Sequence, residues 1–247
     1  MKKINKQTKK RILLLSFAVL IVVYLWWGNS SIKVTEYSLN NGNLPESFDG
    51  FKIAHVSDLH DAEFGKNNKR LIKHLEELKP DIIAVTGDSV DENRTNVDLT
   101  LKFFEKAVDV APCYFVTGNH EAGISKEDYQ LLESSLLDLG VIVLKNQEKI
   151  IEKNGEKISV SGIDDPYFAS RNNKSPASQM SVENLNDVSS FDGYRILLSH
   201  RPEYFEAYVE ANIDLVLSGH AHGGQFRIPL VMNGFFAHII AQFYFRV

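Results

Sequence analysis

Short apolar runs recur along the chain, and each one ends at glycine or polar residues. The run at 82–85 reads Ile-Ile-Ala-Val and lies between Pro80 and Gly87. A continuous run of this length, rich in β-branched residues, is typical of a strand buried on both faces of a sheet. Comparable runs predict four more buried strands, at 51–56, 114–116, 196–198 and 215–217.

Segments with helical spacing alternate with these runs. Apolar residues lie three and four positions apart in 69–78, and 97–108 repeats the pattern. Ser125 begins a third helix, with Asp128 in the capping-box position and Gly140 just past its end. The alternation of strand and helix favours an α/β fold.

The pattern changes in the second half of the chain. Residues 150–161 alternate on either side of Asn154-Gly155, which is a strong signal for a β-hairpin. The following stretch, 162–190, is polar, and we expect one short helix in it near 182–185. This stretch is either a solvated loop or a surface segment that flanks the functional site and shapes substrate entry.

The N-terminus combines a basic cluster with an apolar helix. Residues 1–11 carry six Lys or Arg residues, and the 16 residues of 12–27 are almost entirely apolar. Tyr24, Trp26 and Trp27 crowd the far end, as aromatic residues do at membrane interfaces. No small-residue cleavage site follows, so an uncleaved signal-anchor is favoured over a cleaved signal peptide.

These features divide the chain into three parts. Residues 1–31 are expected to form a cytoplasmic basic tip and a single transmembrane helix, which places the rest of the chain outside the cell membrane. Residues 32–50 form a linker with a strand expected at 33–39, and 51–247 form one domain. The apolar tail at 233–247 is either a truncated or shifted end or a segment that rests on the membrane.

Composition narrows the function classes. The 247 residues are 44% hydrophobic and 24% charged, which suits one large core. The net charge of −5 gives no electrostatic reason to expect nucleic-acid binding. Cys113 is the single cysteine, so a disulfide framework and a cysteine-based zinc site are excluded, and we expect it to be buried.

The ends of the predicted strands share one kind of chemistry. Each is followed by aspartate, asparagine or histidine, and in open α/β sheets ligands lie at the carboxyl ends of strands. Carboxylate, amide and imidazole groups are ligands for divalent metal ions. The residues concerned are Asp58, His60, Asp88, Asn119, His120, His200, His220 and His222.

Taken in order, these motifs resemble those of the calcineurin-like metallophosphoesterase superfamily, and of its bacterial membrane-anchored members in particular. The resemblance implies a double β-sheet sandwich flanked by α-helices, with the motifs on loops along one edge. The family pattern D-x-H, G-D-x-x-D, G-N-H-[DE], a lone His and G-H-x-H stands here as Asp58/His60, Gly87-Asp88-Ser89-Val90-Asp91, Gly118-Asn119-His120-Glu121, His200 and Gly219-His220-Ala221-His222.

The resemblance also assigns roles. Asp88 is expected to bridge two divalent metal ions, with manganese, iron or zinc favoured by the histidine content. Such a pair neutralises a phosphate group and activates a water molecule. The other ligands fall into two sets, Asp58, His60 and His222 for the first ion and Asn119, His200 and His220 for the second.

Two further residues match the catalytic positions of the family. His120 corresponds to a histidine that is not a metal ligand and protonates the leaving group, and Asp91 is expected to hold and polarise its imidazole. Glu92 is a departure, because phosphoprotein phosphatases of this superfamily carry arginine at that position. A phosphoprotein substrate is therefore not supported.

These observations together predict a membrane-anchored hydrolase of phosphomonoester, diester or pyrophosphate bonds. The anchor favours a phosphoester substrate linked to a lipid or to the cell wall. Two alternatives stay open at this point, an inert metal-binding envelope protein and a soluble exported nucleotide phosphodiesterase. The oligomeric state is left open.

Overall fold

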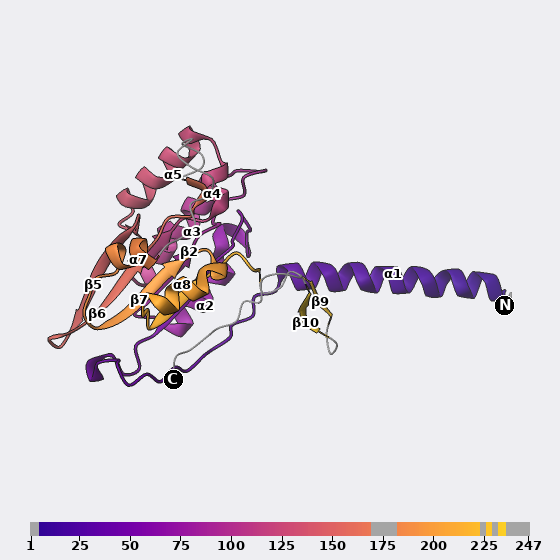
Figure 1. The fold of residues 1–247 in the computed structure, drawn as a ribbon. Coiled ribbons are helices and arrows are strands. Elements are labelled where there is room, and N and C mark those ends of the chain that lie inside the picture. Colours follow the sequence, from indigo (N-terminus) through magenta and orange to yellow (C-terminus); the bar gives the residue numbers. More distant parts are fainter. Residues whose placement is uncertain (1–4, 169–181, 223–225, 229–231, 236–247) are drawn as a thin grey trace.

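The computed structural model describes residues 5–168, 182–222, 226–228 and 232–235. The first helix is α1 (Lys6–Ser30), whose side chains are exposed from Lys6 to Gly28 and which projects away from the folded domain (Figure 1). Asn5 caps α1 by accepting a hydrogen bond from the backbone N–H of Thr8. Its segment Lys6–Gly28 is long and apolar enough to cross a membrane.

The first sheet is fully parallel. Its four strands are adjacent in the order in which they occur in the chain, and a crossover segment precedes each new strand. β2 is buried on both faces, as its continuous apolar run predicts. The strands are β1 (Ile53–Val56), β2 (Ile82–Thr86), β3 (Cys113–Val116) and β4 (Ile142–Val143).

The second sheet is mixed. Its first two strands form the predicted hairpin, and Asn154 and Gly155 adopt the left-handed conformation that a tight hairpin turn requires. The next two strands run parallel to β6. The strands are β5 (Gln147–Lys153), β6 (Glu156–Gly162), β7 (Tyr194–Ser199) and β8 (Leu215–Ser218), and β9 (Phe226–Ile228) and β10 (Met232–Phe235) form a separate antiparallel pair.

Helices cover the outer faces of both sheets (Figure 1). The apolar core divides accordingly into a layer between the first sheet and its helices, a layer between the sheets, and a layer under α7 and α8. The helices are α2 (Lys69–Leu78), α3 (Val97–Val110), α4 (Asn119–Gly123), α5 (Lys126–Asp138), α7 (Val182–Val188) and α8 (Phe205–Glu210), with 3₁₀ turns at Glu46–Phe48, Lys66–Asn68 and Pro202–Tyr204.

Most predicted helices and strands are confirmed, and Cys113 is buried as expected. Two expectations need correction. The N-terminal helix is longer than 12–27, because the Lys and Arg residues before it are good helix formers and continue it to Lys6. The strand expected at 33–39 is wrong, because this exposed stretch has no pairing partner in the described structure. The tail beyond 235 lies outside the described residues.

Candidate metal centre

The predicted site residues meet at one edge of the sandwich. Asp58 follows β1, Asp88 follows β2 and Asn119 follows β3, all at the carboxyl ends of parallel strands. His200 follows β7 and His220 follows β8 in the second sheet, also at carboxyl ends. Parallel pairing within each sheet therefore places the loops that follow these strands at the same edge.

The side chains form two groups that share one carboxylate. The first group holds Asp58, His60, Asp88 and His222, and the second holds Asp88 with His200 and His220. Within each group the ligand atoms lie within 4.8 Å of one another. Asp88 is the common member, and its side chain is 1% exposed, so its oxygens face the other site residues rather than water.

Short distances join the two groups through Asp88. Oδ2 of Asp88 lies 3.1 Å from Nε2 of His200 and 3.7 Å from Nε2 of His60. The Nε2 atoms of His60 and His222 face each other at 3.2 Å. Nitrogen lone pairs that converge on carboxylate oxygens in this way are an arrangement that a divalent cation satisfies.

Two buried atoms support this fit. Oδ1 of Asn119 and Nε2 of His200 are buried without a hydrogen-bond partner among the described residues. Nδ1 of His200 donates to the carbonyl oxygen of Thr86 at 2.7 Å, which leaves Nε2 as the atom with the free lone pair. A buried acceptor without a partner is costly, and a metal ion would satisfy both. The residues present therefore fit a metal site.

Backbone strain concentrates at the same loops. Asp58, His60, Asp88, His220 and His222 all have positive φ, between 45° and 66°. Few residues other than glycine adopt this region, and it costs free energy. The strained backbone aims these five side chains at one point, which is typical of a functional site.

Two motif glycines are required by close approach. A Cβ on Gly118 would collide with the side chain of Asp88, and one on Gly219 would collide with Ser57 and lie 2.7 Å from Oδ2 of Asp58. The backbone N–H of His220 donates to the Asp58 carboxylate at 3.0 Å, which fixes that loop against the first one. The glycines thus let the ligand loops pack against each other.

Glu121 is a site residue that the sequence analysis left without a role. Its buried carboxylate accepts hydrogen bonds from the backbone N–H groups of Asp88, Ser89 and Gly118 at 2.7–2.8 Å. Burial, with the nearby charge of Asp88, raises the pKa of Glu121 to about 7. The acidic last position of the motif G-N-H-[DE] was the signal that could have identified it.

His120 lies beside the two groups. Its Nε2 is 3.9 Å from Oδ2 of Asp88, and its Nδ1 accepts a hydrogen bond from the backbone N–H of Glu92 at 3.0 Å. The expected hydrogen bond from Asp91 to this imidazole is not present among the described residues. The Asp91 carboxylate accepts instead from the backbone of Asn93 and from Arg94, because the turn after Asp91 folds back over it.

The protonation states follow from burial and neighbouring charge. Burial lowers the pKa of His60, and burial together with Arg201 lowers that of His220, which keeps both imidazoles in the neutral form that binds metal ions. Burial would raise the pKa of Asp88, but the imidazole of His200, whose Nε2 lies 3.1 Å from Oδ2, holds it below the usual range. Burial opposes the charged form of His200, yet Asp88 outweighs it and raises the pKa of His200 to about 9 without a metal ion, so a metal ion at Nε2 would have to displace a proton from that atom.

Comparison with known proteins identifies this arrangement. A family model described as calcineurin-like phosphoesterase matches residues 51–224. The chain belongs to this family. Membership makes it a hydrolase that acts on phosphoesters, and divalent metal ions are the cofactors of the family.

Relatives in several organisms share the domain. The metallophosphoesterase YkoQ of Bacillus subtilis (strain 168) is 32% identical over 223 residues, which cover 88% of this chain and 79% of YkoQ. A "transmembrane protein with metallophosphoesterase domain" of Danio rerio is 30% identical, over 89% of this chain and 52% of that protein. Phosphodiesterase YaeI of Escherichia coli (strain K12) is 30% identical, over 75% of this chain and 65% of its own length. The chain thus spans about half of the fish protein and about two thirds of YaeI.

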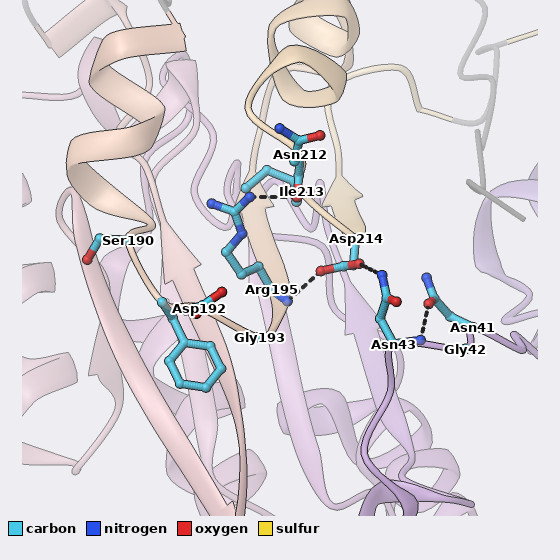
Figure 2. A pocket seen from close by; sticks show the side chains of 11 residues that line it. Asn41, Gly42, Asn43, Ser190, Asp192, Gly193, Arg195, Asn212, Ile213 and Asp214 are labelled. Atoms are coloured by element: carbon cyan, nitrogen blue, oxygen red, sulfur yellow. Dashed lines mark hydrogen bonds between the residues drawn. The ribbon is translucent and has the colours of Figure 1, made fainter.

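A polar pocket lies at the other end of the second sheet. It is lined by the linker around Asn43, by Arg195 near the start of β7 and by Asp214 just before β8 (Figure 2). The side chain of Arg195 donates to the backbone carbonyls of Ala211 and Asn212. Since the metal-ligand candidates occupy the opposite ends of these strands, this pocket is separate from the candidate metal centre.

Proposed function

We propose that this metallophosphoesterase works with two divalent metal ions and acts on a phosphoester at the outer surface of a cell membrane. The position of Asp88 carries the proposal, because its carboxylate belongs to both groups of ligand candidates. A carboxylate shared in this way is what a pair of ions a few ångströms apart requires.

The residues divide the work as follows. Asp58, His60 and His222 would hold the first ion, and Asn119, His200 and His220 the second, with Asp88 between them. Imidazole-rich ligand sets favour manganese, iron or zinc over magnesium. When bound, such a pair supplies charge neutralisation of the phosphate and an activated water.

His120 is assigned the protonation of the leaving group. Its Nδ1 accepts the Glu92 N–H, so the proton of the neutral imidazole resides on Nε2, the atom that faces Asp88 and the two ligand groups. A neutral imidazole is too weak an acid to give up this proton, so protonating a departing alkoxide would require the doubly protonated form, in which Nδ1 no longer accepts from the Glu92 N–H. Asp91 is assigned a supporting role through its negative charge, since its electrostatic interaction with His120 does not depend on a direct hydrogen bond.

Location narrows the substrate class. The apolar helix α1 and the basic residues before it support a single-pass anchor with the N-terminus in the cytoplasm. An anchored domain works on what lies near the membrane, so we assign it a lipid-linked or cell-wall-linked phosphoester. The relative YaeI is named a phosphodiesterase, which supports a diester as the first substrate to try.

The test is a panel of phosphoesters with the full-length protein in detergent. After chelator treatment, we expect turnover of bis(p-nitrophenyl) phosphate to return with manganese, iron or zinc, and phospholipid and wall-polymer diesters to follow. Equal turnover with no metal restored would refute the proposal. An absence of turnover on every phosphoester at full metal occupancy would favour an inert metal-binding protein instead.

A further inference from the structure

Arg201 follows His200 directly and is nearly buried, at 8% exposure. Its guanidinium forms a two-pronged ion pair with Asp165, with Nε at 2.6 Å and Nη2 at 3.2 Å from the two carboxylate oxygens. Asp165 is itself 2% exposed. A buried ion pair of this geometry orients the guanidinium rigidly, because both prongs must align with the carboxylate.

The carboxylate that holds Arg201 is fixed in turn. The backbone N–H of Asp165 donates to Oγ1 of Thr117, which directly precedes the Gly118-Asn119 loop. The ring of Tyr167 lies 4.8 Å from the guanidinium carbon. The start of the polar stretch 162–190 is therefore bound to the ligand loops, and Arg201 has a set position beside them.

The third nitrogen of the Arg201 guanidinium, Nη1, faces the candidate metal centre and also lies 3.4 Å from Oε1 of Glu203. Nη1 lies 2.9 Å from Nε2 of His220, a member of the second ligand group. Arginine keeps its charge and can only donate, so this contact uses the single lone pair of neutral His220, which is the one that a metal ion would take. A bound ion would therefore release Nη1 from the imidazole and leave it free to donate elsewhere. A fixed cation beside a divalent-cation site opposes metal binding by repulsion, and an anion between the two would turn that repulsion into attraction.

The sequence lacks a cation where protein phosphatases of the superfamily have one, since Glu92 occupies that position. Arg94, which lies nearby, has a side chain that is 84% exposed and pairs with Asp91. Among the described residues, Arg201 is the guanidinium that contacts a candidate metal ligand.

We propose that Arg201 binds the phosphoryl group of the substrate, with Nη1 donating to a phosphate oxygen held between it and the second metal position. Asp165 and Tyr167 position the guanidinium for this contact. The inference rests on the proposed function and adds to it a specificity residue, one that selects for an anionic phosphate and replaces the missing arginine at position 92.

Binding of inorganic phosphate to metal-loaded protein, measured by calorimetry beside metal content, tests the proposal. The variant Arg201→Gln/Asp165→Asn removes both charges and leaves no buried ion unpaired. A charge-assisted hydrogen bond predicts that phosphate binds about 10- to 150-fold more weakly while metal content stays unchanged. Arg201→Lys keeps the charge but loses the two-pronged geometry of the guanidinium. Its phosphate affinity should lie between that of the wild type and that of the double variant.

Arg195→Gln is the matched control, because this arginine is likewise held in place, in its case by backbone carbonyls, but lies at the far end of β7 (Figure 2). It should leave phosphate affinity unchanged. Unchanged phosphate affinity in both Arg201 variants, or weaker binding that follows from lost metal, would overturn the inference. Failure of the proposed function looks different, since the wild-type protein would then turn over no phosphoester with any metal.

Discussion

Glu121 and Asp88 lie on different strand-end loops, yet Oε2 of Glu121 accepts a hydrogen bond from the backbone N–H of Asp88 at 2.8 Å. The same carboxylate accepts from Ser89 and Gly118, so one buried side chain ties together the loops after β2 and β3. Glu121 therefore sets the distance between the shared carboxylate and the loop that carries Asn119.

Removal of the Glu121 carboxylate should lower the stability of the protein. Glu121→Ala leaves several buried backbone N–H groups without an acceptor, and we expect the free energy of unfolding to fall by roughly 3 kcal/mol or more. Urea denaturation in detergent measures the loss. The matched control is Glu133→Ala, which removes a surface pair with Lys145 and should cost less than about 1 kcal/mol. Equal losses in the two variants would show that Glu121 does not tie the loops.

Close packing around Gly219 gives a second prediction. A methyl group there would push Asp58 and Ser57 out of place, so Gly219→Ala should weaken metal affinity by about 10- to 100-fold. Gly155→Ala is the control, since Gly155 has φ +83° with open space around it. That variant should lose roughly 1–2 kcal/mol of stability and keep its metal affinity. Metal titration of both variants distinguishes local crowding from general destabilisation.

The role of His120 can be separated from metal binding. His120→Asn should retain the metal content of the wild type and lose rate by roughly 10²–10⁴-fold on an alkyl phosphodiester. The loss should shrink on a nitrophenyl diester, because that leaving group needs little protonation. If the variant loses metal, or slows both substrates equally, His120 does not act as the general acid.

The N-terminal helix predicts where the protein resides. We expect the full chain in the membrane fraction of a bacterial host, resistant to high-salt extraction, because the 23-residue segment Lys6–Gly28 of α1 is long and apolar enough to cross a membrane. Protease added to spheroplasts should digest the domain and spare the N-terminus. Deletion of residues 1–27 should release the protein from the membrane. A shortened, soluble native product would instead indicate cleavage of the segment.

The sequence was sufficient to predict the buried strands of the two sheets and the residue types at their carboxyl ends. Runs such as 82–85 are continuous because β2 is buried on both faces, and parallel pairing then determines that Asp58 and Asp88 share one edge. The strand expected at 33–39 was wrong because the local sequence does not determine whether a pairing partner lies beside it.

Contacts between loops were beyond such reasoning. The bonds of Glu121 to Asp88 and Ser89 and the pairing of Arg201 with Asp165 join residues 32 to 36 positions apart, and they depend on loop geometry that no local pattern encodes. The turn that draws Asp91 away from His120 is likewise set by a hydrogen bond to the backbone of Asn93. Family motifs indicate which residues meet, and the structure supplies the orientation in which they do so.

Metal stoichiometry tests the central claim most directly. Elemental analysis of the full-length wild-type protein, loaded with manganese and desalted, should find about two ions per chain. Asp58→Asn should retain about one ion, because Asp58 belongs to one ligand group, whereas Asp88→Asn should lose both, because Asp88 belongs to both groups. One ion in the wild type, or equal metal content in the two variants, would contradict a centre built around a shared Asp88.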